Sequence, residues 1–125
     1  MRVLLAVEPA DFRKGIDGLC RLCREILAED PFSGVVFGFR NRRATAVKFL
    51  VYDGRAFWLC HMRLSEGRLA WWPQGGADDD KGREVASHEL SVMLAGGDPR
   101  RAPVKPAWRR LEQRTPGNSV AASVV

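Results

Sequence analysis

Two runs of alternating apolar residues flank the dipeptide Asp53-Gly54, and this pattern constrains the fold more than any other feature of the sequence. Asp-Gly between such runs is the strongest short-range indication of a β-hairpin with a two-residue turn. The register that this turn predicts puts three facing pairs on one side of the sheet: Val51 with Ala56, Phe49 with Trp58, and Val47 with Cys60. An antiparallel sheet built around this hairpin is therefore expected.

Further strands are predicted from short apolar runs that end at turn residues. They are residues 2–7, residues 35–40 and residues 68–72. Pro9 follows the first of these runs and Pro73 the last, and proline ends a strand because it has no N–H to donate. The loop from Asn41 to Thr45 is expected to keep Phe39 opposite Val47 on the same face.

A long helix is expected from about Asp11, a favourable N-cap, to Ala28. Asp30-Pro31 ends it, since a residue before proline avoids the helical region. Its apolar positions follow the helical period and should face the sheet: Phe12, Ile16, Leu19, Cys20, Cys23, Ile26 and Leu27.

A shorter helix is expected at residues 85–95, after a Gly- and Asp-rich loop at residues 75–82. Its candidate buried residues are Leu90, Met93 and Leu94. Residues 98–125 lack apolar periodicity and are expected to form a basic, Pro-containing, flexible tail. The sequence thus predicts one α+β domain, residues 1–97, with an antiparallel sheet of four to five strands and one long and one short helix packed on it.

The chain carries 20 Lys and Arg against 15 Asp and Glu, a formal net charge of +5. This excess favours an anionic partner, commonly nucleic acid, and a basic enzyme or scaffold is the alternative. No apolar run approaches the ~20 residues that span a bilayer. The opening run is also too short for the apolar core of a signal peptide. We therefore expect a cytoplasmic protein with no membrane partner.

The candidates for metal or catalytic chemistry are weak. The run Asp78-Asp79-Asp80 lies in one loop, whereas two-metal sites need carboxylates that converge from different elements. Cys20 and Cys23 have zinc-site spacing but lie on the apolar stripe of the long helix. Cys60 and His61 are neighbours in a strand and point to opposite faces. We expect three free thiols and predict no catalytic residue, metal or cofactor.

The best candidate site is a second hairpin, which we call the basic hairpin: the strand at 35–40, the loop at 41–45 and the strand that leads to Asp53. Arg40, Arg42 and Arg43 are placed at its tip, and Lys48 follows on the strand face away from the core. Cations mixed with aromatic residues suit phosphate contacts and base stacking. The candidate nucleic-acid-binding residues are Arg40, Arg42, Arg43, Lys48, Arg63 and Arg68. A charged tip also protects a soluble sheet protein from aggregation, so a solvated turn is the alternative interpretation.

The strand face that carries Lys48 also carries Leu50, Phe57 and Leu59. These side chains are too apolar for an ordinary exposed face. Either a helix covers them or they form a protein interface. The second functional hypothesis is therefore a protein-interaction module without DNA contact, and a third is a nuclease that uses the Asp-rich loop.

Four segments together resemble one known family. They are FRKGIDGL at 12–19, DPFSG with FGFRNRR within 30–43, KFLVYDG at 48–54 and RLSEGRLAW at 63–71. In order and spacing they are similar to the TnpB accessory protein, the second open reading frame, of insertion sequences of the sixty-six type. The resemblance covers roughly residues 2–96. Ser65 in place of an acidic residue, the extra Trp72 and the tail after Asp98 depart from it.

The resemblance implies a bacterial mobile element and a non-catalytic protein that assists its transposase, which is a separate protein. DNA at the element ends and the transposase proteins of the same element are the implied partners, and a homo-oligomer stays open. The expected function is accessory to DNA transposition, through binding of DNA or of the DNA-bound transposase.

Overall fold

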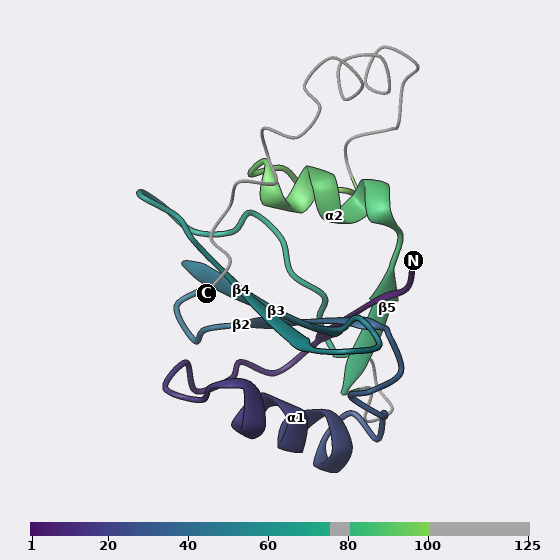
Figure 1. Ribbon diagram of the computed structural model, residues 1–125. Helices are drawn as coiled ribbons and strands as arrows, with labels where there is room; N and C mark the ends of the chain where they lie inside the picture. The colour runs from purple at the N-terminus through teal and green to yellow at the C-terminus, as the bar shows by residue number, and fades with distance from the viewer. Residues whose placement is uncertain (76–80, 101–125) are drawn as a thin grey trace.

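The computed structural model describes residues 1–75 and 81–100 and shows one mixed five-stranded sheet between two helices (Figure 1). The strands lie in the order β4-β3-β2-β1-β5. In chain order the elements are β1 (Val3–Ala6), α1 (Ile16–Glu25), β2 (Val36–Arg40), β3 (Ala46–Tyr52), β4 (Phe57–Arg63), β5 (Gly82–Val85) and α2 (Ser87–Leu94). The α+β class is confirmed, with a sheet that is mostly but not wholly antiparallel.

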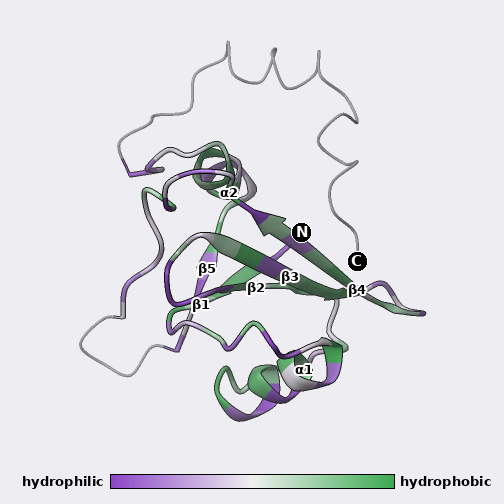
Figure 2. Cartoon of the chain, turned by 90° about the vertical axis from the view of Figure 1, so that its left-hand side faces the viewer, coloured by the Kyte–Doolittle hydropathy of each residue, from purple (hydrophilic) through white to green (hydrophobic). Residues whose placement is uncertain are grey.

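The parallel pair of β1 and β2 is the exception. Val3 lies opposite Val36, and α1 belongs to the connection between the two strands. All four residues of β1 are buried, because the sheet is covered on both faces. Leu4 and Ala6 pack on the α1 side, whereas Val3 and Leu5 pack toward α2. Figure 2 shows the largely hydrophobic strands between the two helices.

The β3–β4 hairpin is confirmed, but its predicted register is wrong by two residues. The observed pairs are Val51 with Trp58, Phe49 with Cys60, and Val47 with Met62. The turn takes four residues because the Asp53 carboxylate accepts hydrogen bonds from the N–H groups of Arg55 and Ala56, each at 2.8 Å. Since the error is an even number, each side chain keeps its predicted face.

The β2–β3 register is wrong by one residue, and this changes the faces. Phe39 lies opposite Lys48, not Val47, and Arg40 lies opposite Val47. The turn at 41–45 is asymmetric because Ala44 adopts a left-handed conformation with φ 58°. The aromatic residues of β2 therefore share a face with Lys48 and with the apolar residues that sequence analysis placed outside the core.

That face is covered by α1. Leu50 and Leu59 are buried in one cluster with Phe37, Leu19 and Cys23. Of the two explanations for this apolar face, cover by a helix is the correct one. The opposite face carries a second core around Val47 and Trp72, packed against α2.

Helix α1 is shorter than predicted at both ends. It begins at Ile16 after Gly15, so the prediction that Asp11 caps it is wrong. The Asp11 carboxylate instead accepts a hydrogen bond from the N–H of Arg13 at 2.9 Å, two residues on, in a local turn. The predicted burial of Leu19 is confirmed, since it is 0% exposed, but that of Ile26 is wrong, since it is 45% exposed.

Lys48 is buried, with 8% of its surface exposed, so its predicted place on an outer face is wrong. Its ammonium group donates hydrogen bonds to the carbonyls of Phe12 at 2.8 Å and Lys14 at 3.0 Å. It also lies 5.1 Å from the centre of the Phe12 ring, within cation–π range. Lys48 thus ties the segment before α1 to the middle of the sheet.

The predicted strand at 68–72 is wrong, because this segment crosses the α2 side of the sheet without pairing. Buried Trp72 fixes it by donating its indole N–H to the carbonyl of Ala6 at 2.8 Å. The strand next to β1 is instead β5, which sequence analysis divided between a loop and the start of a helix. Helix α2 is confirmed. Of its three predicted buried residues, Met93 is buried, whereas Leu90 and Leu94 are only partly buried, and Val92 is buried in addition.

Two sequence features fall outside the described residues. They are the run Asp78–Asp80 and residues 101–125 of the expected tail. The domain boundary near residue 97 therefore stays a prediction. In the part of the chain that the structure describes, neither helix is long and apolar enough to cross a membrane.

Replacing Lys48 with methionine tests its role between sheet and helix. The variant keeps the apolar length of the side chain but leaves two partly buried carbonyls without their donor, so unfolding should become easier by about 1–3 kcal/mol. Urea denaturation measures this. Lys81→Met, at an exposed lysine, should change stability by no more than about 0.5 kcal/mol. Equal stability of Lys48→Met and the wild type would contradict the assigned role.

Alanine substitution compares a buried residue of α1 with Ile26, the residue that follows the helix. Leu19→Ala removes a fully buried side chain and should cost about 2–5 kcal/mol of unfolding free energy. Ile26→Ala, at a position that is 45% exposed, should cost clearly less. Thermal and urea unfolding of both variants check the order, and a larger loss at Ile26 would overturn the packing described here.

Candidate nucleic-acid interface

The turn between β2 and β3 is held in one conformation by Asn41. Its side-chain oxygen accepts hydrogen bonds from the N–H groups of Thr45 at 2.8 Å and Ala46 at 3.1 Å. The N–H of Ala44 donates to the Asn41 carbonyl at 3.1 Å. Arg42 and Arg43 occupy the middle of this turn and are exposed. A short, internally bonded turn therefore projects two neighbouring guanidinium groups into solvent.

The segment after β4 brings two further arginines to the same end of the sheet. The N–H of Leu64 donates to the carbonyl of Thr45 at 2.9 Å, and the N–H of Leu69 donates to that of Ala44 at 2.8 Å. Arg63 and Arg68 each directly precede one of these donors and are exposed. We call Arg42, Arg43, Arg63 and Arg68 the basic end.

The charges of the basic end are not neutralised by ion pairs. Four ion pairs join described residues, and none involves Arg42, Arg43, Arg63 or Arg68. Glu66 is an exposed acid in the loop between two of these arginines. Asp11 lines a hollow together with Arg42 and Arg43, but its carboxylate is paired with Arg13. Four cations without an ion pair among the described residues make this end suited to an anionic partner.

Two of the six predicted site residues do not join the basic end as free cations. Lys48 is buried under the segment before α1, as described above. Arg40, the last residue of β2, is half-buried and donates to the carbonyl of Val7 at 3.3 Å. Its Nε is buried without a hydrogen-bond partner among the described residues. Both residues mainly serve the fold.

Two surface hollows adjoin the basic end. One, of about 460 Å³, is lined by Phe12, Asn41, Arg42 and Arg43, among others. The other, of about 310 Å³, is lined by Arg40, Ala44, Leu69, Trp71 and Arg100, among others.

Sequence analysis missed the second hollow because it assigned Arg100 to the tail. The guanidinium of Arg100 lies 5.7 Å from the centre of the Trp71 ring and is paired with Asp98 at 2.9 Å. The spacing Asp98-Pro99-Arg100 is typical of a local turn, and this signal was present in the sequence. Stacked arginine and tryptophan beside a cationic surface suit contact with a base or sugar.

The cysteines lie in two separate places and are free thiols. Cys20 and Cys23 face the α1 core, whereas Cys60 lies opposite Phe49, which packs on the α2 side. Burial raises the pKa of Cys23 to about 12 and also raises that of Cys20, so both stay protonated at neutral pH. Residues 1–75 and 81–100 contain no cluster of His, Cys, Asp and Glu side chains suited to a metal ion.

His61 lies opposite Lys48 and packs its ring edge-on to Phe12, with ring centres 5.6 Å apart. Partial burial, with the nearby positive charges of Lys48 and Arg63, lowers the pKa of His61. It is therefore neutral at physiological pH and adds no charge to the basic end.

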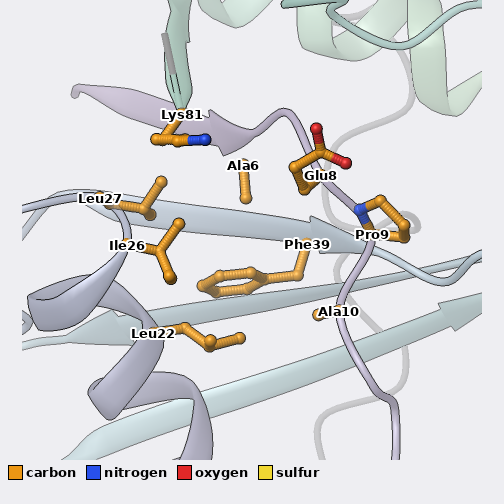
Figure 3. Close-up of a pocket in the computed structure, with 9 residues that line it drawn as sticks. All are labelled: Ala6, Glu8, Pro9, Ala10, Leu22, Ile26, Leu27, Phe39 and Lys81. Carbon is orange, nitrogen blue, oxygen red and sulfur yellow. The ribbon is translucent and has the colours of Figure 1, made fainter. Parts of the chain in front are cut away.

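An apolar hollow of about 260 Å³ opens between α1 and the chain leaving β1 (Figure 3). Leu22, Ile26 and Phe39 line it, and Glu8 and Lys81 are its charged lining residues. The hollow offers room for an apolar side chain, but its lining is unsuited to binding phosphate.

Comparison with known proteins gives one consistent result. The family profile described as "IS66 Orf2 like protein" matches residues 1–103. The chain is 31% identical over 109 residues to "Uncharacterized protein y4jC" of Sinorhizobium fredii, covering 87% of this chain and 90% of that protein. It is 32% identical over 99 residues to "Uncharacterized protein y4hO" of the same organism, covering 78% and 82%. No solved structure gives a significant match.

The family match includes every described strand and helix and all four arginines of the basic end. The resemblance seen in the four sequence segments is thereby confirmed. The chain belongs to the IS66 Orf2-like family of insertion-sequence accessory proteins.

Proposed function

We propose that this protein is a non-catalytic accessory factor that binds DNA at the ends of its insertion sequence through the basic end. One observation carries the proposal. Four exposed arginines, none of them ion-paired within the part of the chain that the structure describes, are gathered at one end of the sheet by backbone hydrogen bonds between the turn at 41–45 and the segment after β4.

The expected contacts are with phosphate. Guanidinium groups bind phosphate oxygens with charge-assisted, bidentate hydrogen bonds. A short turn offers few side chains that can reach base edges, so these contacts fix position on the duplex more than they read sequence. The fixed turn limits the conformational entropy that Arg42 and Arg43 lose on binding, because their backbone is already ordered.

The transposase of the same element is the second proposed partner, and this proposal is supported by the family. The alternative of a pure protein-interaction module relied on an exposed apolar face at Leu50 and Leu59. Both residues are buried beneath α1, so that face offers no support for it. We therefore favour DNA contact over the alternative.

Removing two charges from the turn tests the proposal. Arg42→Ala with Arg43→Ala should weaken binding to element-end DNA. Each phosphate contact contributes about 0.9 to the slope of log affinity against log salt concentration, so this slope should fall by up to about two. Fluorescence anisotropy over a range of salt concentrations measures both quantities, in the absence and presence of the transposase proteins.

The matched control removes the same charge from another surface. Arg21→Ala with Arg24→Ala takes two exposed arginines from α1 and should leave affinity and slope nearly unchanged. Circular dichroism checks that each variant is folded. If both double variants behave alike, or if the wild type binds no element-end DNA even with its partner proteins, the turn is only a solvated loop.

A further inference from the structure

Among residues 1–75 and 81–100, strand β4 forms one edge of the sheet and lacks the usual protection of an edge. It has seven residues, no proline and five apolar side chains, and its only formally charged residue at neutral pH is Arg63, at its end. Native proteins commonly protect an edge with short strands, charges or proline. The other edge strand, β5, has four residues and carries Arg83 and Glu84. The two edges therefore differ in their capacity to accept another strand.

The hydrogen bonds at the two ends of the hairpin show which backbone groups of β4 face outward. The N–H of Asp53 donates to the carbonyl of Ala56 at one end, and the N–H of Leu64 donates to that of Thr45 at the other. Hydrogen-bonded and non-hydrogen-bonded pairs alternate in an antiparallel ladder. The backbone groups of Trp58, Cys60 and Met62 therefore bond inward to β3. The residues between them present their N–H and C=O groups at the open edge. They are Phe57, Leu59, His61 and Arg63.

We propose that two copies of this chain pair through β4, antiparallel, about a twofold axis at Cys60. Cys60 is the middle residue of the strand, so this register matches all seven residues. The outward-facing residues then oppose one another, Phe57 with Arg63 and Leu59 with His61. In this way every outward donor and acceptor of the edge finds a partner, and the two sheets become one.

The side chains are complementary in this register. On the α2 side Trp58, which is 45% exposed, opposes Met62 of the second copy, a favourable sulfur–aromatic pair. On the α1 side Phe57 opposes the cation of Arg63. Trp58, the exposed aromatic residue of β4, thus gains cover in the pair.

Charge selects the antiparallel arrangement with a second copy. The two Arg63 side chains lie at opposite ends of the paired strands, about 20 Å apart for six residues of extended chain. This exceeds the screening length of ~8 Å at physiological salt, so the two cations barely repel one another. In-register parallel pairing would instead bring them side by side.

The oligomeric state of the purified full chain, washed free of nucleic acid, tests the proposal. Light scattering after size exclusion should give twice the 14.0 kDa of one chain. His61→Pro removes an outward N–H but no bond to β3, so the chain should stay folded by circular dichroism and become monomeric. The matched variant His61→Ala keeps the N–H and should stay dimeric. A monomeric wild type, or a folded His61→Pro variant that remains dimeric, would overturn the proposal.

A second measurement does not depend on the folding of any variant. In this register Cys60 opposes Cys60 of the second copy in a non-hydrogen-bonded pair, with Cα atoms about 4.5 Å apart, within reach of a disulfide. Mild oxidation should therefore link the wild-type chains, and mass spectrometry should find Cys60 joined to Cys60. Cys60→Ser should abolish the link but keep the dimer. Links through the buried Cys20 or Cys23 instead, or none in a wild-type dimer, would contradict this register.

Discussion

The parallel pairing of β1 with β2 is the constraint on which the rest of this structure depends. Parallel neighbours need a connection that crosses the sheet, and this chain uses the segment containing α1 for it. With α1 on one face and the 69–74 segment and α2 on the other, β1 is buried on both sides. The continuous apolar run Val3–Ala6 is the sequence counterpart of that double cover.

Lys48, a candidate DNA-binding residue in the sequence, has a structural role in the fold. The connection must be held against the sheet before α1 begins, and the carbonyls of Phe12 and Lys14 lie there with a buried ammonium group between them. A lysine supplies donors at the end of a long apolar stem, so it reaches from β3 to these carbonyls while its methylenes stay in the core. The charged group of Lys48 therefore forms hydrogen bonds inside the fold and is not exposed at the surface.

The two proposed interaction surfaces arise from different parts of the same sheet. Turns at strand ends do not need to continue a ladder, so they can carry arginines that face only water. An edge strand instead has unpaired backbone groups along its length, and these groups can hydrogen-bond to another strand. Arg63 lies where β4 meets the basic end, which makes this strand the link between the two surfaces.

Local patterns in the sequence determined several features correctly. The place of the turn at Asp53-Gly54, the alternating strands and the helical period around Leu19 each rest on interactions within a few residues, and the hairpin, β2, β3 and α2 follow from them, though not the length of the turn. The exposed positions of Arg42 and Arg43 also follow, because a turn leaves its central side chains in water. Family membership was also visible in the sequence, in four short segments.

Only the tertiary structure decided the rest. The short segment Gly82–Val85 becomes a strand because β1 offers it an edge, and residues 68–72 do not, because Trp72 is anchored over the sheet instead. The one-residue change at Ala44 reversed the faces of β3 relative to β2, and with them the place of Lys48. Which arginines meet at one end, and which lysine is buried, depends on contacts between residues distant in sequence, and local periodicity carries no information about those contacts.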